Sequence, residues 1–482
     1  MRVTVLTDPG TGPGDAFDPR VFDSGLAPAD PDVLGRLVAG VRGADLVAPP
    51  VVLPDFHHKT TMEMPSSIAV ATLGTIRPVF TSASVNCGMA LIALETEPPG
   101  RVAIERFFRL VRDRYPYPPT RRLELSAEEV VQAAVKGAGF AADRFGIEAD
   151  ELERIEEGGR LDVERRGGAE AIRRLLPKMT VQLSRLRFGT IGPTNHFLEL
   201  QRVEEVYDEV AAERLGVRQG QLTIQYHGGG GVLASQMGRL FGRRKKLSRQ
   251  QRLQMAVLKP LFQLASARSV GQIRERMALY FSDEYPPVPL DGSEGLRLML
   301  ANAAAMNYGF AFRLATYQTL RSLAVRCFGA MSSSLVVDSP HNSMYEEQVG
   351  GQPAIVHRHN ACRAFPASKM PPGTAFGDVG QAVLVPGTHR TSSYLCVAAE
   401  RAERSLHSAC HGAGTMVEEF ERRGLSDVHE DGRHTIRFRY TGAAPEEAPH
   451  LDDRGVDEAL SILVGNGLVR RVARMRPIAV MH

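Results

Sequence analysis

With 482 residues, of which 43% are hydrophobic and 23% charged, the chain can bury a substantial core and could hold one large domain or two to three smaller ones. A formal net charge of +3 excludes a strongly cationic protein, although a local basic groove is compatible with it. No apolar run reaches transmembrane length, the start lacks the hydrophobic stretch of a signal peptide, and five scattered cysteines do not indicate a disulfide framework. We therefore expect a cytoplasmic protein with reduced thiols.

The first elements are short. We expect a strand over residues 3–6, a helix over residues 31–41, and a buried strand over residues 51–56 that ends at His57 and His58. Polar residues at the end of a buried strand are often functional. Each of the two histidines is equally compatible with a solvated loop.

A second apolar run begins at residues 78–80 and ends in small polar residues before Cys87 and Gly88. A lone cysteine in an apolar setting is usually an inert core residue. The glycine after Cys87, however, permits a turn that would present the thiolate as a metal ligand.

The segment from Ser126 to about Met179 is charged and has a helical pattern that opens with a Ser126–Glu129 capping box. It carries no chemical motif. We interpret residues 121–180 as a helical insertion, a clamp or a small subdomain within a larger catalytic domain.

Two stretches then place histidines beside glycines. Residues 188–201 begin with a Gly-rich turn, continue through Asn195, His196 and Phe197, and alternate like a strand. This alternation predicts that His196 and Glu199 point to opposite faces, unless the turn twists the register. A further strand ends at His227 and is followed by four glycines. Those glycines could cradle a phosphate or serve only as a flexible turn.

The second half of the chain supplies a basic run at residues 243–246, which is more typical of a solvated face than of an RNA path. Residues 296–325 predict a long buried helix. A strand then ends at His341, before polar loops at residues 355–363 and 385–394.

The chain ends in a strand over residues 476–482, and it contains no internal repeat or low-complexity linker. Because the chemically interesting residues are spread from residue 55 to residue 482, we expect one interwoven domain that spans residues 1–482.

The hexapeptide at residues 409–414 places His411 between a cysteine and a Gly-Ala-Gly run. Glycines let main-chain amides approach a ligand closely, and such amides suit a phosphate. The imidazole could then act as a nucleophile or as a general acid–base group. Taken alone, a histidine flanked by glycine is more often a loop residue.

Each of four residues is read as the end of an apolar run: Cys87, His196, His227 and His341. One thiolate and three imidazoles suit a transition metal such as Zn²⁺, Mn²⁺ or Fe²⁺. Their separation in sequence gives no diagnostic spacing, so the specificity of the signal comes from the sequence around each residue.

Those surroundings resemble the motifs of the RtcB family of RNA-splicing ligases. Residues 190–199 (TIGPTNHFLE) resemble GTLGxGNHFxE, and residues 86–88 (NCG) resemble the end of DxNCG. Further resemblances follow in family order: His227 with its glycines to HSGSRG, residues 307–313 to NYAxANR, residues 341–342 to HN, residues 357–358 to VHRKGA, residues 386–394 to PGSMGxxSY, and residues 410–414 to CHGAGR. Together they cover about residue 50 to the C-terminus and are highly specific.

The resemblance implies a single large α/β domain, with mixed α+β sheets, that joins RNA 3′-phosphate or 2′,3′-cyclic phosphate ends to 5′-hydroxyl ends with GTP and Mn²⁺. It implies that His411 attacks the α-phosphate of GTP and that GMP passes to the RNA. It implies the metal ligands Cys87, His196, His227 and His341, with Asp55 behind them. The implied GTP-binding residues are Asn195, His196, Phe197, Leu198, Glu199, His341, Asn342, Pro386, Gly387, Thr388, His389, Ser393, His411, Gly412, Ala413, Gly414 and His482. An archease-like activator is a further expectation of the family.

Several positions depart from the family pattern. Ser84 stands where the family has a metal-binding Asp, which weakens a second metal site and favours Zn²⁺ over Mn²⁺. Gly231 and Thr415 stand where the family has arginines, and His482 where it has a lysine. Three readings remain: a ligase with an altered metal site, a guanylylating or nucleotide-binding protein that no longer joins RNA, and a metal-stabilised RNA-binding scaffold without catalysis.

Overall fold

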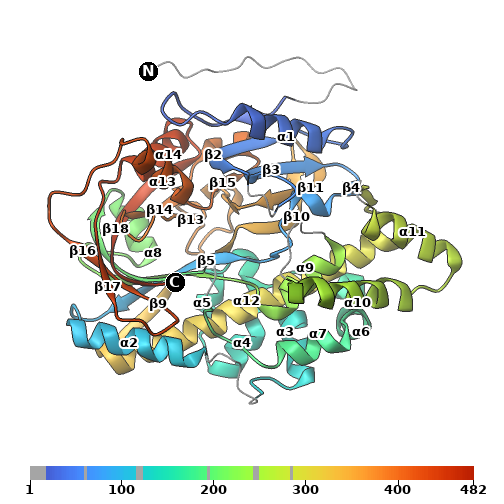
Figure 1. Ribbon diagram of the computed structural model, residues 1–482, viewed down its shortest axis with the longest axis horizontal. Coiled ribbons are helices and arrows are strands. Elements are labelled where there is room, and N and C mark those ends of the chain that lie inside the picture. Colours follow the sequence, from blue (N-terminus) through green and yellow to red (C-terminus); the bar gives the residue numbers. More distant parts are fainter. Residues whose placement is uncertain (1–17, 59–61, 116–122, 193–195, 243–248, 283–285) are drawn as a thin grey trace.

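The computed structural model describes residues 18–58, 62–115, 123–192, 196–242, 249–282 and 286–482. These residues form one large domain of mixed α/β class, as the sequence predicts (Figure 1). None of the described helices is both long enough and apolar enough to cross a membrane. The strand expected at residues 3–6 and the basic run at residues 243–246 lie outside the described residues.

The larger sheet carries most of the residues singled out by the sequence. Within the described part of the chain its strands run, in spatial order, β13 (Ala382–Val385), β14 (Ser393–Ala398), β18 (Val469–Met481), β6 (Leu198–Val206), β7 (Leu222–Gly228), β5 (Gly88–Glu95) and β9 (Ser332–Pro340). Strands β16 (His434–Phe438) and β17 (Glu446–Pro449) extend the sheet beside β18, and only the β16–β18 pair is parallel. The expected final strand is therefore present and lies inside the sheet.

A second sheet covers the N-terminal side of the domain. Its strands run β1 (Arg20–Val21), β2 (Val51–His57), β3 (Ser66–Thr72), β11 (Gln352–His359) and β10 (Asn342–Val349). Two small ladders pair β12 (Ala361–Arg363) with β15 (Ser408–Cys410) and β4 (Thr75–Ile76) with β8 (Val288–Pro289). The strand expected from residue 51 is confirmed.

The polar loop expected at residues 355–363 is wrong, because these residues form β11 and β12. The polar side chains there are buried and paired. The Arg358 guanidinium donates to both Glu347 carboxylate oxygens at 2.7 and 2.9 Å and to the Ser408 hydroxyl at 2.9 Å. Buried polar groups that are fully hydrogen-bonded are compatible with a central strand, although their sequence pattern resembles that of a loop.

Helix α12 (Ser293–Phe328) is the central helix of the helical side of the molecule (Figure 1). Around it pack α2 (Arg101–Arg114), α3 (Ala127–Lys136), α4 (Ala138–Phe145), α6 (Gly168–Leu175) and α9 (Gly231–Phe241). The remaining helices are α1 (Pro31–Val41), α5 (Ala149–Glu153), α7 (Lys178–Ser184), α8 (Glu209–Leu215), α10 (Arg249–Ala265), α11 (Val270–Phe281), α13 (Gly414–Arg422) and α14 (Arg454–Gly465). The helices expected at residues 31–41 and 296–325 are both confirmed.

Polar residues fix the register of α12 within the core. Asn307 accepts a hydrogen bond from the Leu161 amide at 2.7 Å and donates to the carbonyls of Ala134 and Leu161 at 3.1 and 3.0 Å. Arg313, which is fully buried, lies 2.6 Å from the Asp338 carboxylate. Because breaking such a buried pair would leave an uncompensated charge, these contacts hold α12 against β9.

The segment that begins at Ser126 is helical, and its capping box is present, with Ser126 and Glu129 bonded reciprocally at 3.1 and 2.7 Å. Its helices α3, α4 and α6 pack directly on α12. That residues 121–180 form an insertion remains a prediction.

Candidate metal centre and nucleotide cavity

Three potential metal ligands meet at one end of the larger sheet. Cys87 precedes β5 directly, His227 lies near the end of β7, and His341 follows β9 directly. The register pairs Gly88 with both Gly228 and Pro340, so neighbouring strands deliver the three residues to one place. Their ligand atoms all lie within 4.8 Å of one another, and the Cys87 Sγ is 3.1 Å from the His227 Nε2.

Cys87 therefore begins an apolar strand rather than ending one. The run that opens at residues 78–80 forms a 3-10 helix and a loop instead of a strand. Pro78 and the small polar residues that follow favour such a turn. The sheet itself starts one residue after the thiol.

His196 lies beside this cluster. Its Nε2 is 3.7 Å from the Cys87 Sγ, and its ring centroid is 5.1 Å from that of His227. The His227 amide donates to the Phe197 carbonyl at 2.9 Å, which ties the start of β6 to β7. The one cysteine and three histidines expected to hold metal thus converge, with His196 outside the tightest group of three.

The burial of these side chains fits them to a metal. Cys87 is 4% exposed and His341 is 1% exposed, and the His341 Nδ1 has no hydrogen-bond partner among the described residues. Burial lowers the pKa of His341 well below its usual value and that of His196 to about 4. Both imidazoles are therefore neutral at physiological pH, with a lone pair available for a cation. A thiolate with nitrogen ligands suits Zn²⁺ and other transition metals.

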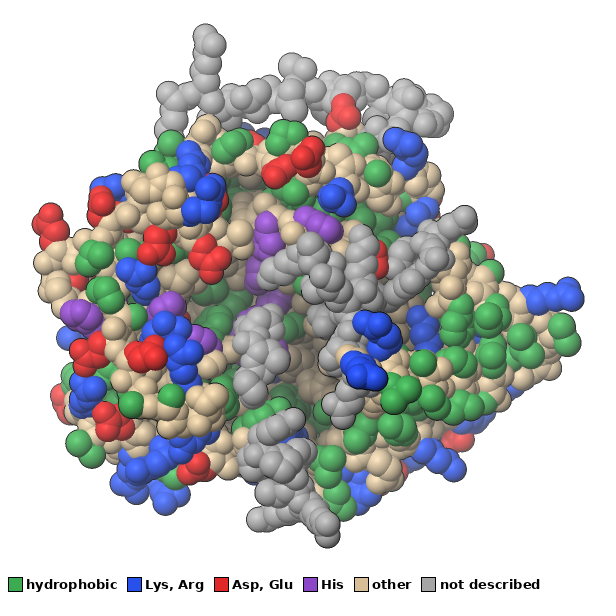
Figure 2. Space-filling model, viewed as in Figure 1, with side chains coloured by type: hydrophobic (Ala, Val, Ile, Leu, Met, Phe, Trp, Pro, Cys, Tyr) green, Lys and Arg blue, Asp and Glu red, His purple; other side chains and the backbone are tan. Residues whose placement is uncertain are grey.

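His411 approaches the same cluster from β15. It follows Cys410 directly, and its ring centroid lies 4.9 Å from that of His341. The β12–β15 ladder places it there, because Ala361 pairs with Cys410 and its amide donates to the His341 carbonyl at 3.0 Å. In Figure 2, histidine side chains gather in a hollow of this face.

The loop after His411 is closely packed. The Ala413 amide donates to the Pro386 carbonyl at 2.9 Å, and a Cβ at Gly412 would lie 3.1 Å from Pro386 atoms. Asp55, 6% exposed, accepts a hydrogen bond from the Met416 amide at 2.8 Å, in the first turn of α13. A carboxylate at a helix N-terminus is stabilising, so Asp55 anchors the segment that carries His411.

A cavity of about 530 Å³ opens onto the metal cluster. Its lining also includes Ser84 and three residues that belong to no recognisable motif, namely Tyr115, Arg187 and Arg239. The described residues that line it include no aspartate or glutamate. Arg187 directly precedes the Gly-rich stretch at residue 188, and that position is the only sequence signal that could have pointed to it.

A second cavity of about 730 Å³ lies on the other side of His196. It contains several residues expected to bind GTP: His196, Phe197, Glu199, Gly387, Thr388, His389 and His482. Strand β6 begins only at Leu198, so the alternation that would put His196 and Glu199 on opposite faces does not extend to His196, and both residues line this cavity. Sequence reasoning missed Arg390 and Arg437, of which Arg437 donates to the His482 Nε2 at 2.9 Å.

The remaining residues expected to bind GTP surround this cavity. Asn195 lies outside the described residues. Leu198 is fully buried in the core, and Ser393 accepts a hydrogen bond from the Gln201 amide at 3.2 Å. Asn342 lines the metal cavity and accepts from the Asn360 amide at 3.0 Å. Pro386, Ala413 and Gly414 form the packed turn behind His411.

Burial shifts the pKa values of side chains in this second cavity, which we call the nucleotide cavity because residues expected to bind GTP line it. Burial raises the pKa of Glu199 to about 8, against a hydrogen bond from Gln201 at 2.8 Å that lowers it. Burial also lowers the pKa of His389 to about 4, and it lowers the pKa of His482. Glu199 is thus poised to change charge near neutral pH when a ligand offers hydrogen-bond donors.

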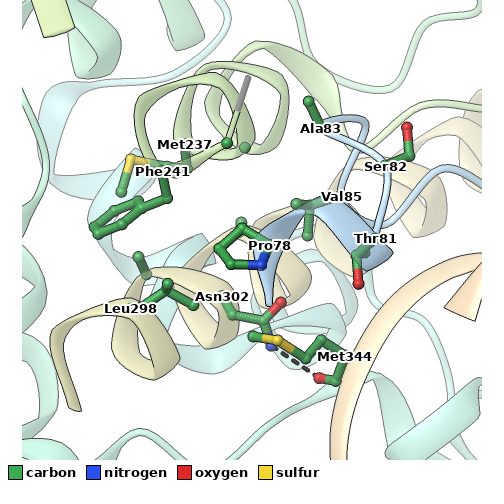
Figure 3. A pocket seen from close by; sticks show the side chains of 14 residues that line it. Pro78, Thr81, Ser82, Ala83, Val85, Met237, Phe241, Leu298, Asn302 and Met344 are labelled. Atoms are coloured by element: carbon green, nitrogen blue, oxygen red, sulfur yellow. Dashed lines mark hydrogen bonds between the residues drawn. The ribbon is translucent and has the colours of Figure 1, made fainter. Parts of the chain in front are cut away.

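A small apolar cavity of about 50 Å³ lies behind the loop that carries Ser84 (Figure 3). Ser82 and Val85 line both this cavity and the metal cavity, so the loop separates the two. A Cβ at Gly238 would lie 2.1 Å from the Ala83 carbonyl oxygen. Helix α9 therefore fixes the position of the loop through a glycine.

Comparison with known proteins identifies the family. The family model described as tRNA-splicing ligase RtcB matches residues 38–482. The tRNA-splicing ligase RtcB of Thermococcus kodakarensis is 29% identical over 460 residues, which cover 89% of this chain and 86% of that protein. That of Archaeoglobus fulgidus is 29% identical, with 84% and 82% covered, and that of Pyrococcus horikoshii is 29% identical, with 82% and 44% covered. Since the family match spans most of the chain, this protein belongs to the RtcB family.

Proposed function

We propose that this chain is an RNA ligase that joins RNA 3′-phosphate or 2′,3′-cyclic phosphate ends to 5′-hydroxyl ends through a histidine–GMP intermediate. The observation that carries the proposal is the approach of His411 to the metal cluster, with 4.9 Å between its ring centroid and that of His341. The names of the related tRNA-splicing ligases support RNA as the substrate.

Cys87, His227 and His341 would hold one metal ion, and His196 with the shared thiolate would hold a second one more weakly. Bound Mn²⁺, or Zn²⁺ as the softer ligand set suggests, would supply Lewis-acid stabilisation of charge on phosphate oxygens. Ser84 offers no carboxylate, so the second site of this chain is expected to be the weaker one.

In this proposal His411 is the nucleophile. As a neutral imidazole it forms an N–P bond to the α-phosphate of GTP, and pyrophosphate leaves. An RNA 3′-phosphate oxygen then attacks this phosphorus and breaks the N–P bond, so that GMP activates the RNA end. The 5′-hydroxyl of the second RNA displaces GMP and closes the phosphodiester, whereas a 2′,3′-cyclic end first needs hydrolysis to the 3′-phosphate.

The cavity beside His196 is the proposed guanylate site. Glu199 would accept hydrogen bonds from the base, and the loop at residues 386–389 would enclose the nucleotide, with His482 and Arg437 facing it. The turn at residues 412–414 would leave its amides near the phosphate. Asp55 would hold that turn through the first turn of α13.

Intact-mass measurement after incubation with GTP tests the proposal, with Mn²⁺ and Zn²⁺ in separate reactions. We expect a GMP adduct on the wild type and none on His411→Ala. His434→Ala, at an exposed position on β16, is the matched control and should keep the adduct. An archease-like protein is added as a further condition. A wild type that takes no adduct under any of these conditions contradicts the proposal.

A second candidate function is a paralogue that binds metal, nucleotide or RNA without ligating. The absence of a carboxylate among the described residues of the metal cavity, with serine at position 84, favours it. It predicts the GMP adduct, or nucleotide binding alone, without joined RNA. A gel assay with one 3′-phosphate strand and one 5′-hydroxyl strand separates the two candidates.

A further inference from the structure

Helices α10 and α11 carry large apolar side chains that face solvent. In Figure 2, hydrophobic side chains gather on the lobe at the right of the view, where Figure 1 places these two helices. Single exposed apolar residues are normal, whereas a set of them on one surface marks an interaction site. Six residues, exposed by 38 to 72%, form the set that we call the lobe face: Leu253, Val257, Leu261, Val270, Ile273 and Met277.

The spacing of these residues puts them on one side of each helix. Leu253, Val257 and Leu261 recur every four residues along α10, and Ile273 and Met277 are four residues apart on α11. Side chains at this spacing are neighbours on a helix surface. Each helix therefore presents a row of apolar side chains to solvent.

The other sides of the two helices are packed on the domain. Leu258 of α10 and Tyr280 of α11 are buried. Arg276 of α11 donates to the Gln263 carbonyl of α10 at 2.8 Å and to the Glu294 carboxylate at the start of α12 at 2.6 Å. These contacts join the two helices to each other and to the core, so the lobe face has a fixed support.

Positive charge lies beside the apolar rows. Residues 249–282 contain five arginines, one lysine and a single carboxylate, that of Glu275. Arg249 lies one helical turn before Leu253, and Arg274 lies one turn before Met277, so both cations adjoin the lobe face. Four arginines are exposed and form no ion pair with a described residue: Arg249, Arg252, Arg268 and Arg274.

This charge selects among the possible occupants of the face. A second copy related by a two-fold axis through the lobe face would bring the same arginines together, and like charges at an interface are unfavourable. Helices that lie on lipid surfaces commonly add Trp or Phe to their apolar side, whereas the exposed residues here are aliphatic apart from Met277. An acidic protein segment with apolar side chains matches both the arginines and the rows.

We propose that the lobe face docks an acidic amphipathic helix of another protein. The apolar side chains of that helix would cover the rows on α10 and α11, and carboxylates along its edges would pair with the exposed arginines. Docking of this kind uses apolar anchors at i, i+3 or i+4, and i+7 of the bound helix. The proposal is independent of the ligase proposal, because no residue of the lobe face lines the metal cavity or the nucleotide cavity.

Fluorescence anisotropy with two synthetic helical peptides tests the proposal on the full-length protein. The acidic probe carries leucine at the anchor spacing and glutamate along both edges, and the basic probe carries lysine in place of every glutamate. We expect the acidic probe to bind at least about tenfold more tightly than the basic one. Its affinity should fall as salt is added, because salt screens exposed charges.

Variants at exposed positions separate the apolar contribution from the charged one. The Leu253→Ser/Leu261→Ser double variant should weaken binding of the acidic probe about tenfold or more, because it removes apolar contacts. The Arg249→Glu/Arg274→Glu double variant should weaken it by a similar factor and should strengthen binding of the basic probe. Val325→Ser, at an exposed position on α12 away from the lobe face, is the matched control and should bind as the wild type does.

The inference is overturned if the acidic probe binds the wild type no more tightly than the basic one, or if the serine double variant binds it as the wild type does. Two further measurements assign the face to another occupant, and either result also overturns the inference. Co-sedimentation with phosphatidylserine vesicles that the serine double variant loses would identify a lipid surface. A concentration-dependent increase in mass by light scattering, lost in the same variant, would identify a second copy.

Discussion

The two cavities that share His196 are built from different chemistry. The metal cavity combines histidines, a thiol and arginines, and its described lining carries no carboxylate. The nucleotide cavity contains four carboxylate residues, Glu199, Glu418, Glu421 and Glu447, alongside Arg390 and Arg437. The first therefore offers nitrogen and sulfur ligands to a soft cation, while the second offers both hydrogen-bond donors and acceptors. A base and ribose need the second kind of surface.

The largest expected effect is a loss of metal affinity when one ligand is removed from the metal cavity. Cys87→Ser removes the thiolate that lies 3.1 Å from the His227 Nε2. We expect metal affinity to fall at least about a hundredfold, because the loss of a ligand should exceed the 10–100-fold effects of residues behind the ligands. Elemental analysis after purification measures it. Cys327→Ser, near the end of α12, is the matched control and should retain metal. Equal metal content in the two variants would contradict the proposed centre.

The next largest effect is a loss of GTP affinity when only the nucleotide cavity is changed. Glu199→Gln should weaken GTP binding by about ten- to a hundredfold, because a charged acceptor is lost, and it should leave metal content unchanged. In the wild type GTP affinity should rise with pH up to about 8, where Glu199 becomes ionised. Calorimetry between pH 6.5 and 8.5 compares both proteins. A wild type and variant with the same pH dependence would show that Glu199 does not contact the base.

A variant that gains a metal ligand tests the contrast between the two cavities from the other side. Ser84→Asp adds a carboxylate to the metal cavity and should raise the affinity of a second Mn²⁺ about tenfold. The gain is smaller where a water or substrate phosphate supplies the same oxygen ligand in the wild type. Ser82→Asp, on the same loop, is the comparison variant. Titration of metal stoichiometry distinguishes them. Unchanged stoichiometry and affinity in Ser84→Asp would mean that another residue already supplies the missing oxygen ligand.

The smallest expected effect concerns His357, a buried histidine on β11. Burial lowers the pKa of His357 to about 3, and its ring nitrogens lie 3.4 and 3.3 Å from the hydroxyls of Thr72 and Thr81. The unfolded chain binds this proton near pH 6.5, so the stability that His357 contributes is present above that pH and is lost as the pH falls towards 3.

Between pH 7 and pH 5 the metal-free protein should lose about 1–2 kcal/mol of unfolding free energy from His357. Urea unfolding at the two pH values measures the loss. His357→Gln removes the titrating group and should have a smaller difference between the two pH values. A difference as large as that of the wild type would assign the pH dependence to other buried histidines.

Much of the fold could be predicted from residue patterns. The helix at residues 31–41, the capping box at Ser126 and the long helix around Asn307 follow from local periodicity and capping, which the chain encodes over short distances. The β11 strand could not be predicted, because Arg358 is neutralised by Glu347 and donates a hydrogen bond to Ser408, which is distant in sequence. Such pairing is a property of the folded structure.

The candidate site likewise contains residues that could be predicted from the sequence and residues that could not. The residues next to motifs, such as Cys87 and His411, could be selected from sequence because glycine and asparagine surround them. Tyr115, Arg187 and Arg239 carry no motif, and only α9 and the packing around Gly192 bring them to the cavity. The alternation of residues 188–201 also could not show on which side His196 lies, since β6 begins at Leu198, after His196.

The register of β5 between β7 and β9 has a consequence for how the protein is made. Cys87 and His227 are separated by 140 residues, and His341 comes later still, so the three ligand atoms meet only after the chain has closed two long loops. Closing such loops costs entropy that is recovered only when the central sheet is complete. A nascent chain released before residue 341 would lack one of the three ligands. An ion held by all three would therefore be a chemical record of completed synthesis and folding.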